Sequence, residues 1–229
     1  LAVILGGAGE GKTTVLKALY RIYDENGTHI FQLALAGKAA KRMSDATGRR
    51  AWTIASFLQN VKASDFDGPS VVVIDEMSMV DIISLHRLCE RLPPHVRLVF
   101  VGDQNQLMPI GPGLTLHVLA SIDKIPKAEL TTVKRYKGKI AEAAAAIRRG
   151  EWPSLSPDAA SEICFLPCTD DAIAETVVAL YDQDPSKTQI LTPRRNSLEG
   201  TKSLNALCQR RYTGSAKPLR VFNRQYGQY

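Results

Sequence analysis

The residues Gly6-Gly7-Ala8-Gly9-Glu10-Gly11-Lys12-Thr13 decide the fold of this chain. They fit the pattern G-x-x-x-x-G-K-[ST], a loop whose backbone N–H groups surround phosphate oxygens. The loop follows an apolar run at residues 1–5 and precedes apolar residues at helical spacing, Val15, Leu16, Leu19 and Ile22. A strand, a glycine-rich loop and a helix in this order predict a nucleotide site at the helix N-terminus.

The loop pattern also assigns chemical roles to individual residues. We expect Lys12 to reach the β- and γ-phosphates of ATP and the Thr13 hydroxyl to ligate Mg²⁺. Since the backbone of the loop and of the first helical turn surrounds the phosphates, the predicted nucleotide-binding residues are Gly7, Gly9, Gly11, Lys12, Thr13 and Thr14.

Two acidic residues follow the next strongly apolar stretch. Residues 71–74 are the β-branched run Val-Val-Val-Ile, which is typical of a buried central strand, and Asp75 and Glu76 come directly after it. A carboxylate at the carboxyl end of such a strand can hold Mg²⁺, and its neighbour can deprotonate an attacking water. We therefore expect Asp75 to be a metal residue and Glu76 to be the catalytic base.

Strand and helix patterns alternate along the chain, which predicts an α/β fold with a mostly parallel sheet wrapped by helices. A proline-containing stretch at residues 151–158 suggests a boundary between a first domain at residues 1–150 and the start of a second, truncated domain at residues 151–229. Predicted strands include residues 29–36, 71–74, 96–101, 163–166 and 189–192. Predicted helices include residues 37–46, 51–61, 114–122, 140–149, 172–181 and 201–211.

Composition limits the function classes. The 229 residues are 45% hydrophobic and carry a net charge of +6, which favours anionic partners only mildly. No apolar run is long enough to span a bilayer, so we expect no membrane partner. The four cysteines form no C-x-x-C pair, which favours reduced thiols and a cytoplasmic location. Because residue 1 is not Met and lies inside a predicted strand, we expect the chain to be a fragment.

Longer motifs resemble superfamily 1B DNA helicases of the RecD/TraA kind, which include the exodeoxyribonuclease V alpha subunit. The segments VIDEMSMVD at residues 73–81 and VGDQNQLMPIGPG at residues 101–113 carry the resemblance most clearly. LALAGKAAKR at 33–42, TIASFL at 53–58, LTTVKRY at 130–136 and ILTPRRN at 190–196 are similar to further motifs of this family, in the same order.

The resemblance implies two RecA-like domains and ATP-driven, 5′-to-3′ movement on single-stranded DNA, in repair, recombination or conjugative transfer. It implies that Gln106 couples the γ-phosphate to DNA and that Arg135 stabilises the transferred charge. Other subunits of a nuclease or recombination complex are possible partners. The DNA-binding residues that it implies are Gly37, Lys38, Thr53, Phe57, Arg194 and Arg195. The basic residues near residues 33–42 would belong to the same DNA track: Lys38, Lys41, Arg42, Arg49 and Arg50.

Two other functions fit parts of the sequence. A P-loop ATPase that remodels proteins would need no nucleic-acid track, and the segments at residues 33–42 and 190–196 count against it. A non-catalytic module of a larger nuclease or relaxase would not need intact Lys12, Thr13, Asp75 and Glu76. The sequence departs from the family at Ala34-Leu35-Ala36-Gly37, where Ala-Pro-Thr-Gly is usual, so a phosphate contact from a threonine hydroxyl is lost there.

Overall fold

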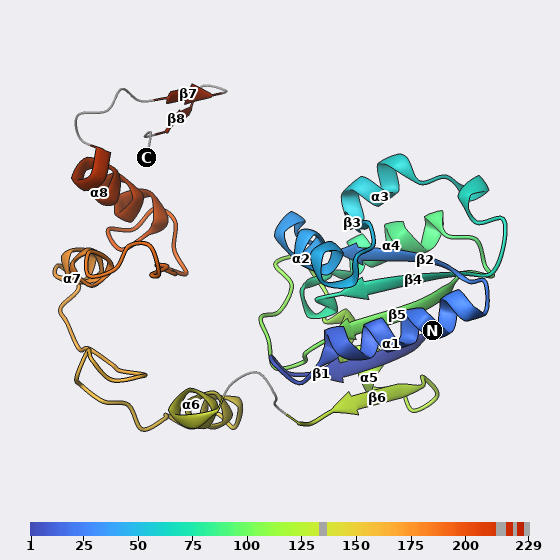
Figure 1. The fold of residues 1–229 in the computed structure, drawn as a ribbon, viewed down its shortest axis with the longest axis horizontal. Coiled ribbons are helices and arrows are strands. Elements are labelled where there is room, and N and C mark those ends of the chain that lie inside the picture. Colours follow the sequence, from blue (N-terminus) through green and yellow to red (C-terminus); the bar gives the residue numbers. More distant parts are fainter. Residues whose placement is uncertain (133–136, 214–218, 222–223, 227–229) are drawn as a thin grey trace. The chain divides into compact units, whose positions relative to one another are not determined.

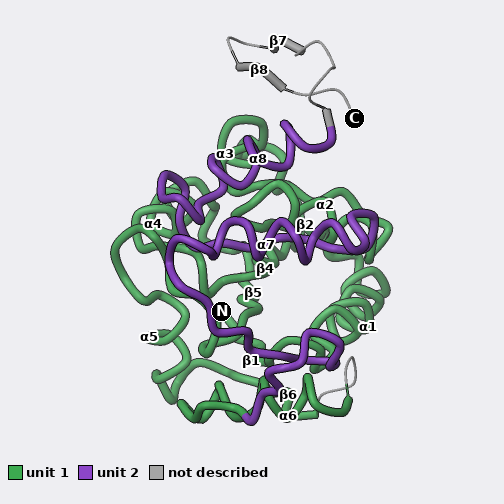
Figure 2. The backbone as a smooth tube through the Cα atoms, turned by 90° about the vertical axis from the view of Figure 1, so that its left-hand side faces the viewer, with its two compact units in different colours: residues 1–153 green, residues 154–229 purple. Residues whose placement is uncertain are grey.

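The computed structural model describes residues 1–132, 137–213, 219–221 and 224–226. The chain forms two compact units, residues 1–153 and residues 154–229, drawn in different colours in Figure 2. The division falls close to the boundary expected at residues 150–151.

Unit 1 is built on a parallel sheet with the strand order β3-β2-β4-β5-β1-β6 in the described residues (Figure 1). The predicted α/β class is confirmed. The carboxyl ends of the neighbouring strands β4, β5 and β1 meet at one edge, where ligands of parallel sheets bind. The strands are β1 (Ala2–Gly6), β2 (His29–Ala34), β3 (Ala51–Thr53), β4 (Ser70–Asp75), β5 (Arg97–Gly102) and β6 (Lys127–Leu130).

Helices cover both faces of this sheet, because successive residues of its buried strands point to opposite sides. Val71 and Val73 pack with α1 and α2 on one face, whereas Val72 and Ile74 pack with α3, α4 and α5 on the other. The helices of unit 1 are α1 (Lys12–Glu25), α2 (Gly37–Thr47), α3 (Ile54–Asn60), α4 (Ile82–Arg91), α5 (Thr115–Ser121) and α6 (Gly138–Arg148), with short 3₁₀ turns η1 (Ala63–Asp65) and η2 (Met77–Met79).

Two edge strands differ from the sequence-based expectations. Residues 51–61 were expected to be helical throughout, but residues 51–53 form β3, which pairs with β2, and the Thr53 side chain then caps α3. Strand β6 was not expected, because its four residues are largely exposed and show no continuous apolar pattern. Both strands depend on pairing with a neighbour rather than on their own hydrophobic pattern.

The Phe57 side chain lies in the core of unit 1 and is 0% exposed. Its ring packs edge-to-face with Phe31 at a centroid distance of 5.6 Å and also contacts Phe66. A nucleotide base has no access to a ring in this position. The expectation that Phe57 contacts DNA is therefore corrected, because the helical spacing of α3 turns this residue towards the sheet.

Unit 2 contains α7 (Ile173–Tyr181), α8 (Thr201–Thr213), β7 (Leu219–Val221) and β8 (Arg224–Tyr226) in its described part. Both helices lie where the sequence predicts them. The strands expected at residues 163–166 and 189–192 do not form there: an isolated bridge joins Ser156 to Cys164, and residues 188–192 have no regular structure. A strand needs a neighbouring strand along its length, and in the described residues of unit 2 the first segment has a single bridge and the second has none.

No helix in the described ranges is long and apolar enough to cross a lipid bilayer.

Replacement of Phe57 by alanine should lower the free energy of unfolding by about 3–5 kcal/mol, because a cavity replaces a fully buried ring. Chemical denaturation monitored by circular dichroism measures this loss. Ile110→Ala is the control, since that side chain is fully exposed and its removal should change the stability by less than about 0.5 kcal/mol. A Phe57→Ala variant as stable as the parent would contradict the core assignment.

Candidate functional site

The glycine-rich loop connects β1 to α1, and its backbone requires glycine. Gly9 has φ 79° and Gly11, the N-cap of α1, has φ 91°. Both lie in the left-handed region that side chains disfavour. A Cβ on Gly11 would meet no atom within 4 Å, so its constraint is conformational rather than steric. The loop thereby turns the N-terminus of α1, with its positive dipole, towards a bound anion.

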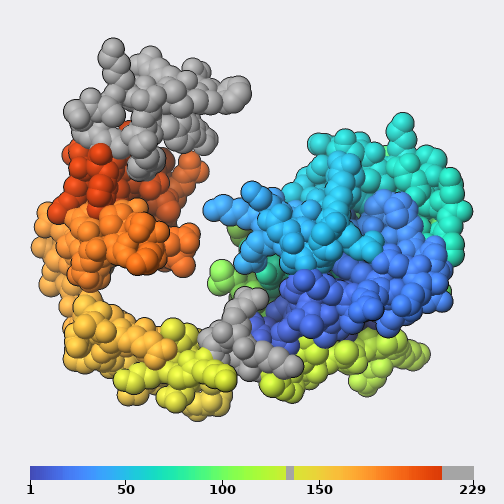
Figure 3. All heavy atoms as spheres, viewed as in Figure 1, coloured from blue at the N-terminus to red at the C-terminus, as the bar shows by residue number. Residues whose placement is uncertain are grey.

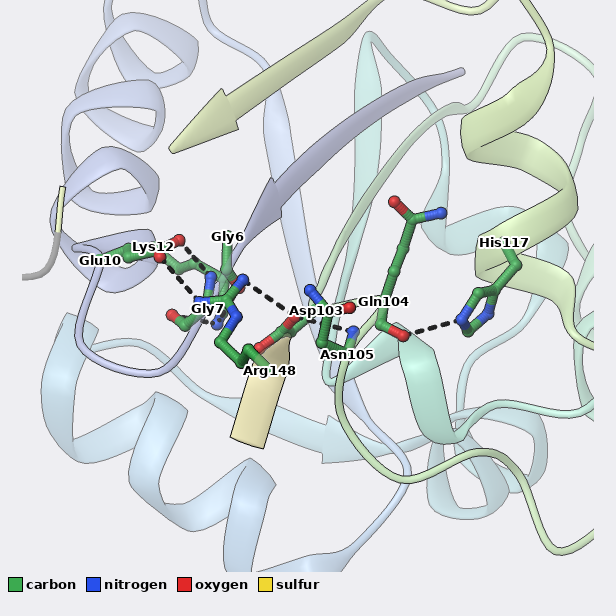
Figure 4. Close-up of polar contacts among 9 residues, drawn as sticks. All are labelled: Gly6, Gly7, Glu10, Lys12, Asp103, Gln104, Asn105, His117 and Arg148. Atoms are coloured by element: carbon green, nitrogen blue, oxygen red, sulfur yellow. Dashed lines mark hydrogen bonds and ion pairs between the residues drawn. The ribbon is translucent and has the colours of Figure 1, made fainter. Parts of the chain in front are cut away.

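The Lys12 side chain folds back over this loop. Its Nζ donates hydrogen bonds to the carbonyl oxygens of Gly6, at 2.7 Å, and Gly7, at 3.0 Å. These bonds hold the ammonium group at the mouth of the loop, where it can exchange a carbonyl partner for a phosphate oxygen. Figure 4 shows Lys12 beside Gly6 and Gly7.

Asp75 and Glu76 lie at the carboxyl end of β4. The Asp75 Oδ1 accepts a hydrogen bond from the Glu76 backbone N–H at 2.9 Å. Glu76 has a left-handed backbone, with φ 53° and ψ 39°, which is rare for a residue with a side chain and costs about 1–3 kcal/mol. Its Oε1 lies 3.4 Å from Nη2 of Arg42, which comes from α2. The strained turn therefore presents two adjacent carboxylates at the sheet edge.

The electrostatics of this pair favour a bound cation. Burial raises the pKa of Asp75 above its usual value, while the hydrogen bond from the Glu76 N–H lowers it. Burial also raises the pKa of Glu76, and the Asp75 charge adds to this, while Lys12 and Arg42 act in the opposite direction. In both groups burial is the largest effect, so a cation in the cavity would offset part of the cost of keeping these carboxylates charged.

A cavity of about 760 Å³ joins these elements. Five of its lining residues come from α2, whose residues 39, 42, 43 and 46 follow helical spacing. The predicted nucleotide-binding residues all line it, and so do Asp75, Glu76 and Gln106. Its other lining residues are Ala8, Leu16, Ala39, Arg42, Met43, Ala46 and Thr47.

Sequence reasoning placed Arg42 in the DNA track, but the structure places it in the wall of this cavity, against Glu76. The i, i+3, i+4, i+7 spacing of residues 39, 42, 43 and 46 is the signal that could have identified one face of α2 as a wall of the site.

A shallow groove of about 390 Å³ lies beside the first turn of α2 and β3. Gly37 and Thr53, two of the predicted DNA-binding residues, line it together with Lys41, Arg50 and Trp52. The Arg50 guanidinium lies over the Trp52 ring, 3.4 Å from its centroid. In the space-filling view, light-blue to cyan residues form this part of the surface of unit 1 (Figure 3). Lys38 is exposed on the same helical turn.

The remaining predicted residues lie elsewhere. Arg194 and Arg195 are exposed in unit 2, and their carbonyl groups accept hydrogen bonds from the backbone N–H groups of Thr201 and Lys202 at the start of α8. Arg194 also pairs with Glu199 at 3.4 Å. Arg135 lies outside the described residues.

The donor set of the cavity fits Mg²⁺. This ion is usually held by one or two carboxylates or hydroxyls together with phosphate oxygens and water, and Asp75 and Thr13 supply such ligands beside the loop. Among the described residues, no group of three or more His, Cys, Asp or Glu side chains could hold a metal by itself. A magnesium ion here would therefore depend on the nucleotide for part of its coordination.

Asp75→Asn should raise the melting temperature of the nucleotide-free protein at pH 7. Because the folded-state pKa of Asp75 is raised, its ionised form opposes folding, and stability falls as the pH rises from about 4 through the raised pKa. Removal of the charge should raise the melting temperature by about 2–4 °C for each kcal/mol by which the free energy of unfolding increases.

The gain should disappear at a pH below about 3.9, where aspartate is protonated in both states. Differential scanning calorimetry from pH 3.5 to 8 tests this, with Asp123→Asn, at a fully exposed position, as the control. A lower melting temperature for Asp75→Asn at pH 7 would contradict the raised pKa of Asp75 in the folded protein.

Comparison of the sequence with protein families and with known proteins identifies relatives of this chain. A model described as an AAA domain matches residues 1–162. The ATP-dependent RecD2 DNA helicase of Deinococcus radiodurans is 31% identical over 218 residues, which cover 90% of this chain and 29% of that protein. The ATP-dependent DNA helicase dda of Enterobacteria phage T4 is 31% identical over 166 residues, 65% of this chain and 38% of that protein.

Conjugal transfer protein TraA of Rhizobium radiobacter is 34% identical over 140 residues, 60% of this chain and 12% of that protein. The expected resemblance to RecD and TraA proteins is therefore confirmed. The chain spans well under half the length of each of these relatives.

A solved structure supports the fold. The Pif1 helicase from Candida albicans superposes with a TM-score of 0.54 at 18% identity, over 95% of this chain and 51% of that one. Its likeness concerns the α/β architecture and not the chemistry. The match of the family model to more than half of the residues, together with the phosphate loop at its start, shows that this chain belongs to the AAA domain family of P-loop proteins.

Proposed function

We propose that this chain is the ATP-hydrolysing motor region of a RecD-like DNA helicase, which binds ATP with Mg²⁺ and moves along single-stranded DNA. The 31% identity to an ATP-dependent RecD2 DNA helicase supports this proposal. We further propose movement from 5′ to 3′, which rests only on the motif resemblance to superfamily 1B helicases. We also propose a role in repair, recombination or conjugative transfer, which the names of the RecD and TraA relatives support.

One observation carries the proposal: α2 contributes to both sites. Its residues 39, 42, 43, 46 and 47 line the cavity beside the phosphate loop, and its residues 37, 40, 41, 44 and 45 line the basic groove. A motor must transmit the state of its nucleotide to its track, and a helix shared by the two sites is a direct physical connection between them.

The residues of the cavity have distinct roles in the proposed hydrolysis. Lys12 would exchange its bonds to the Gly6 and Gly7 carbonyls for bonds to the β- and γ-phosphates. Glu76 would orient and deprotonate the attacking water, and Arg42 would hold its carboxylate in place. Gln106 reaches the same cavity and would respond to the presence of the γ-phosphate.

Thr13 and Asp75 would hold Mg²⁺. When bound, this ion would neutralise charge that develops on the phosphate oxygens. The raised pKa of Asp75 supports this arrangement, since a cation would relieve the cost of its buried charge. The neighbouring nucleotide contacts would come from Gly7, Gly9, Gly11, Lys12 and Thr14, which line the same cavity.

The groove would bind the DNA backbone without regard to sequence. Lys38, Lys41 and Arg50 offer cations for phosphates, and the first N–H groups of α2 at Gly37 offer hydrogen bonds. Thr53 lies in the groove, although its hydroxyl already accepts a hydrogen bond from the Ser56 N–H. Trp52 is the proposed stacking residue: a base would displace the Arg50 guanidinium from its ring, and such stacking is worth about 1–3 kcal/mol per base.

The rest of the proposal concerns the larger protein. We infer a first RecA-like domain at residues 1–150 and the beginning of a second one at residues 151–229, with Arg135 acting on the γ-phosphate and Arg194 and Arg195 contacting DNA. Subunits of a nuclease complex are the proposed partners, because one group of relatives is named RecBCD enzyme subunit RecD. The four free cysteines support a reducing, cytoplasmic location.

Lys12→Ala should abolish ATP hydrolysis, because the cation that contacts the phosphates is lost. Steady-state hydrolysis by the full-length protein, with and without single-stranded DNA, measures this. Lys17→Ala, an exposed lysine on the same helix, is the matched control and should behave like the parent. Strong stimulation by DNA supports the motor, and tailed duplexes then decide polarity. Brisk hydrolysis that is indifferent to DNA would overturn it in favour of a protein-remodelling ATPase.

Trp52→Ala should weaken binding of single-stranded oligonucleotides by about tenfold or more, because one stacking platform is removed. Fluorescence anisotropy at several salt concentrations measures the affinity. Trp152→Ala, the other tryptophan of the chain, is the control and should leave the affinity unchanged. Equal affinities of Trp52→Ala and the parent would remove Trp52 from the DNA site.

A further inference from the structure

Glu10 is a carboxylate inside a loop that binds anions. Its side chain is only 5% exposed. A buried charge is costly unless it is paired and hydrogen-bonded, and a negative charge beside a triphosphate would also repel it. The phosphate-loop pattern does not require an acidic residue at this position. Glu10 therefore needs a cationic partner as well as the hydrogen bond that the Gly7 backbone N–H of the loop provides.

That partner is Arg148, which lies 138 residues further along the chain, in the last turn of α6. Its Nη1 donates a hydrogen bond to Glu10 Oε1 at 3.0 Å, while Glu10 Oε2 accepts one from the Gly7 backbone N–H. Each carboxylate oxygen thus has a donor. Figure 4 shows the Arg148 guanidinium between the loop and Asp103.

Arg148 also reaches the next strand end. Its Nη2 lies 3.9 Å from Oδ1 of Asp103, which is 6% exposed and follows β5. Asp103 shapes the turn that carries Gln106: its Oδ1 accepts a hydrogen bond from the Asn105 N–H at 3.0 Å, and its carbonyl accepts one from the Gln106 N–H at 3.2 Å. One arginine therefore connects α6, the phosphate loop and the turn that carries Gln106.

This network lies behind the phosphate site rather than in it. Neither Glu10, Arg148 nor Asp103 lines the nucleotide cavity, although the residues on either side of Glu10 do. The arrangement also explains Gly7, which does not have a left-handed backbone. A Cβ on Gly7 would collide with the Arg148 guanidinium and come within 2.9 Å of Glu10 Oε1. A side chain at position 7 would have to displace the ends of both flexible side chains, and so would disturb the ion pair.

We propose that Arg148 is a positioning residue of the nucleotide site. It neutralises Glu10 and thereby holds the phosphate loop and the Gln106 turn in the arrangement that receives the triphosphate. The proposal rests on the proposed function only in that the ligand is a nucleoside triphosphate, and it does not depend on a DNA track. Removal of Arg148 would leave a buried, unpaired carboxylate that either repels the nucleotide or moves towards water and takes the loop with it.

A double-mutant cycle tests this proposal. The variants are Arg148→Ala, Glu10→Gln and the combination of the two, and the measurements are the affinity for a fluorescent ATP analogue and the kcat and KM of ATP hydrolysis. Glu10→Gln keeps an acceptor for the Gly7 N–H but removes the charge. Arg149→Ala is the matched control, since this neighbouring arginine pairs with Glu151 at the surface, at 2.7 Å.

Arg148→Ala should weaken nucleotide affinity and raise KM by about tenfold, with a smaller change in kcat. Glu10→Gln should restore most of this loss when it is added to Arg148→Ala, because no buried charge then remains unpaired. Arg149→Ala should change neither quantity. Arg148→Lys retains the cation and should lie between the parent and Arg148→Ala, and it replaces the alanine variant in the cycle if that variant does not fold.

The proposal would be overturned if the effects of the two substitutions were additive. It would also be overturned if Arg148→Ala lowered the melting temperature but left the affinity and KM unchanged, because the Glu10–Arg148 ion pair would then have only a structural role. The parent protein separates this result from failure of the proposed function. If the parent binds ATP but DNA does not stimulate hydrolysis, the helicase assignment fails while the cycle still tests Arg148. If the parent binds no nucleotide, both proposals fail.

Discussion

Four carboxylates meet at one edge of an apolar sheet, and the arrangement of unit 1 depends on how their charges are balanced. Asp75 ends β4 and Glu76 follows it, Asp103 follows β5, and Glu10 lies in the loop after β1. These three strands are neighbours, so parallel pairing forces the acids together. Cations from other elements compensate them: Lys12 from α1, Arg42 from α2 and Arg148 from α6. Burial raises the pKa of Asp75 and of Glu76, so their charged forms are costly on the cavity side, where a magnesium ion would bind.

The balance differs between the two sides of the phosphate loop. Behind the loop, the Glu10 carboxylate has a hydrogen-bond donor on each oxygen, and the guanidinium beside it is only partly exposed. On the cavity side, the Arg42 side chain is 75% exposed and approaches Glu76 only to 3.4 Å. A well-packed ion pair therefore supports the loop from within, while the Arg42–Glu76 contact on the cavity side is long and exposed enough for a ligand to replace it. Rigid support behind a site and exchangeable partners within it are what preorganisation requires.

Much of this architecture is predictable from the sequence because it depends on local patterns. The β-branched run at residues 71–74 identifies a central strand, and the G-x-x-x-x-G-K-T pattern identifies six residues that line the cavity. Short edge strands such as β3 and β6 escape prediction because their stability comes from a neighbour. The Glu10–Arg148 pair escapes it because no periodicity connects residues so far apart. The expectation for Phe57 was wrong because it was carried over from the family motif at residues 53–58, whereas the helical spacing of α3 turns this ring into the core.

The two faces of α2 have a consequence that applies to any pair of ligands that use them. A ligand in the cavity and a ligand in the groove contact the same eleven-residue helix. If occupancy of one site changes the free energy of the helix conformation that the other site prefers, thermodynamic linkage makes the effect reciprocal. The factor by which the first ligand raises the affinity of the protein for the second must then equal the factor by which the second raises its affinity for the first. If the cavity hydrolyses a nucleotide, as proposed, one cavity ligand is replaced by another between two binding steps at the groove, and the coupling energies of the two steps then need not cancel.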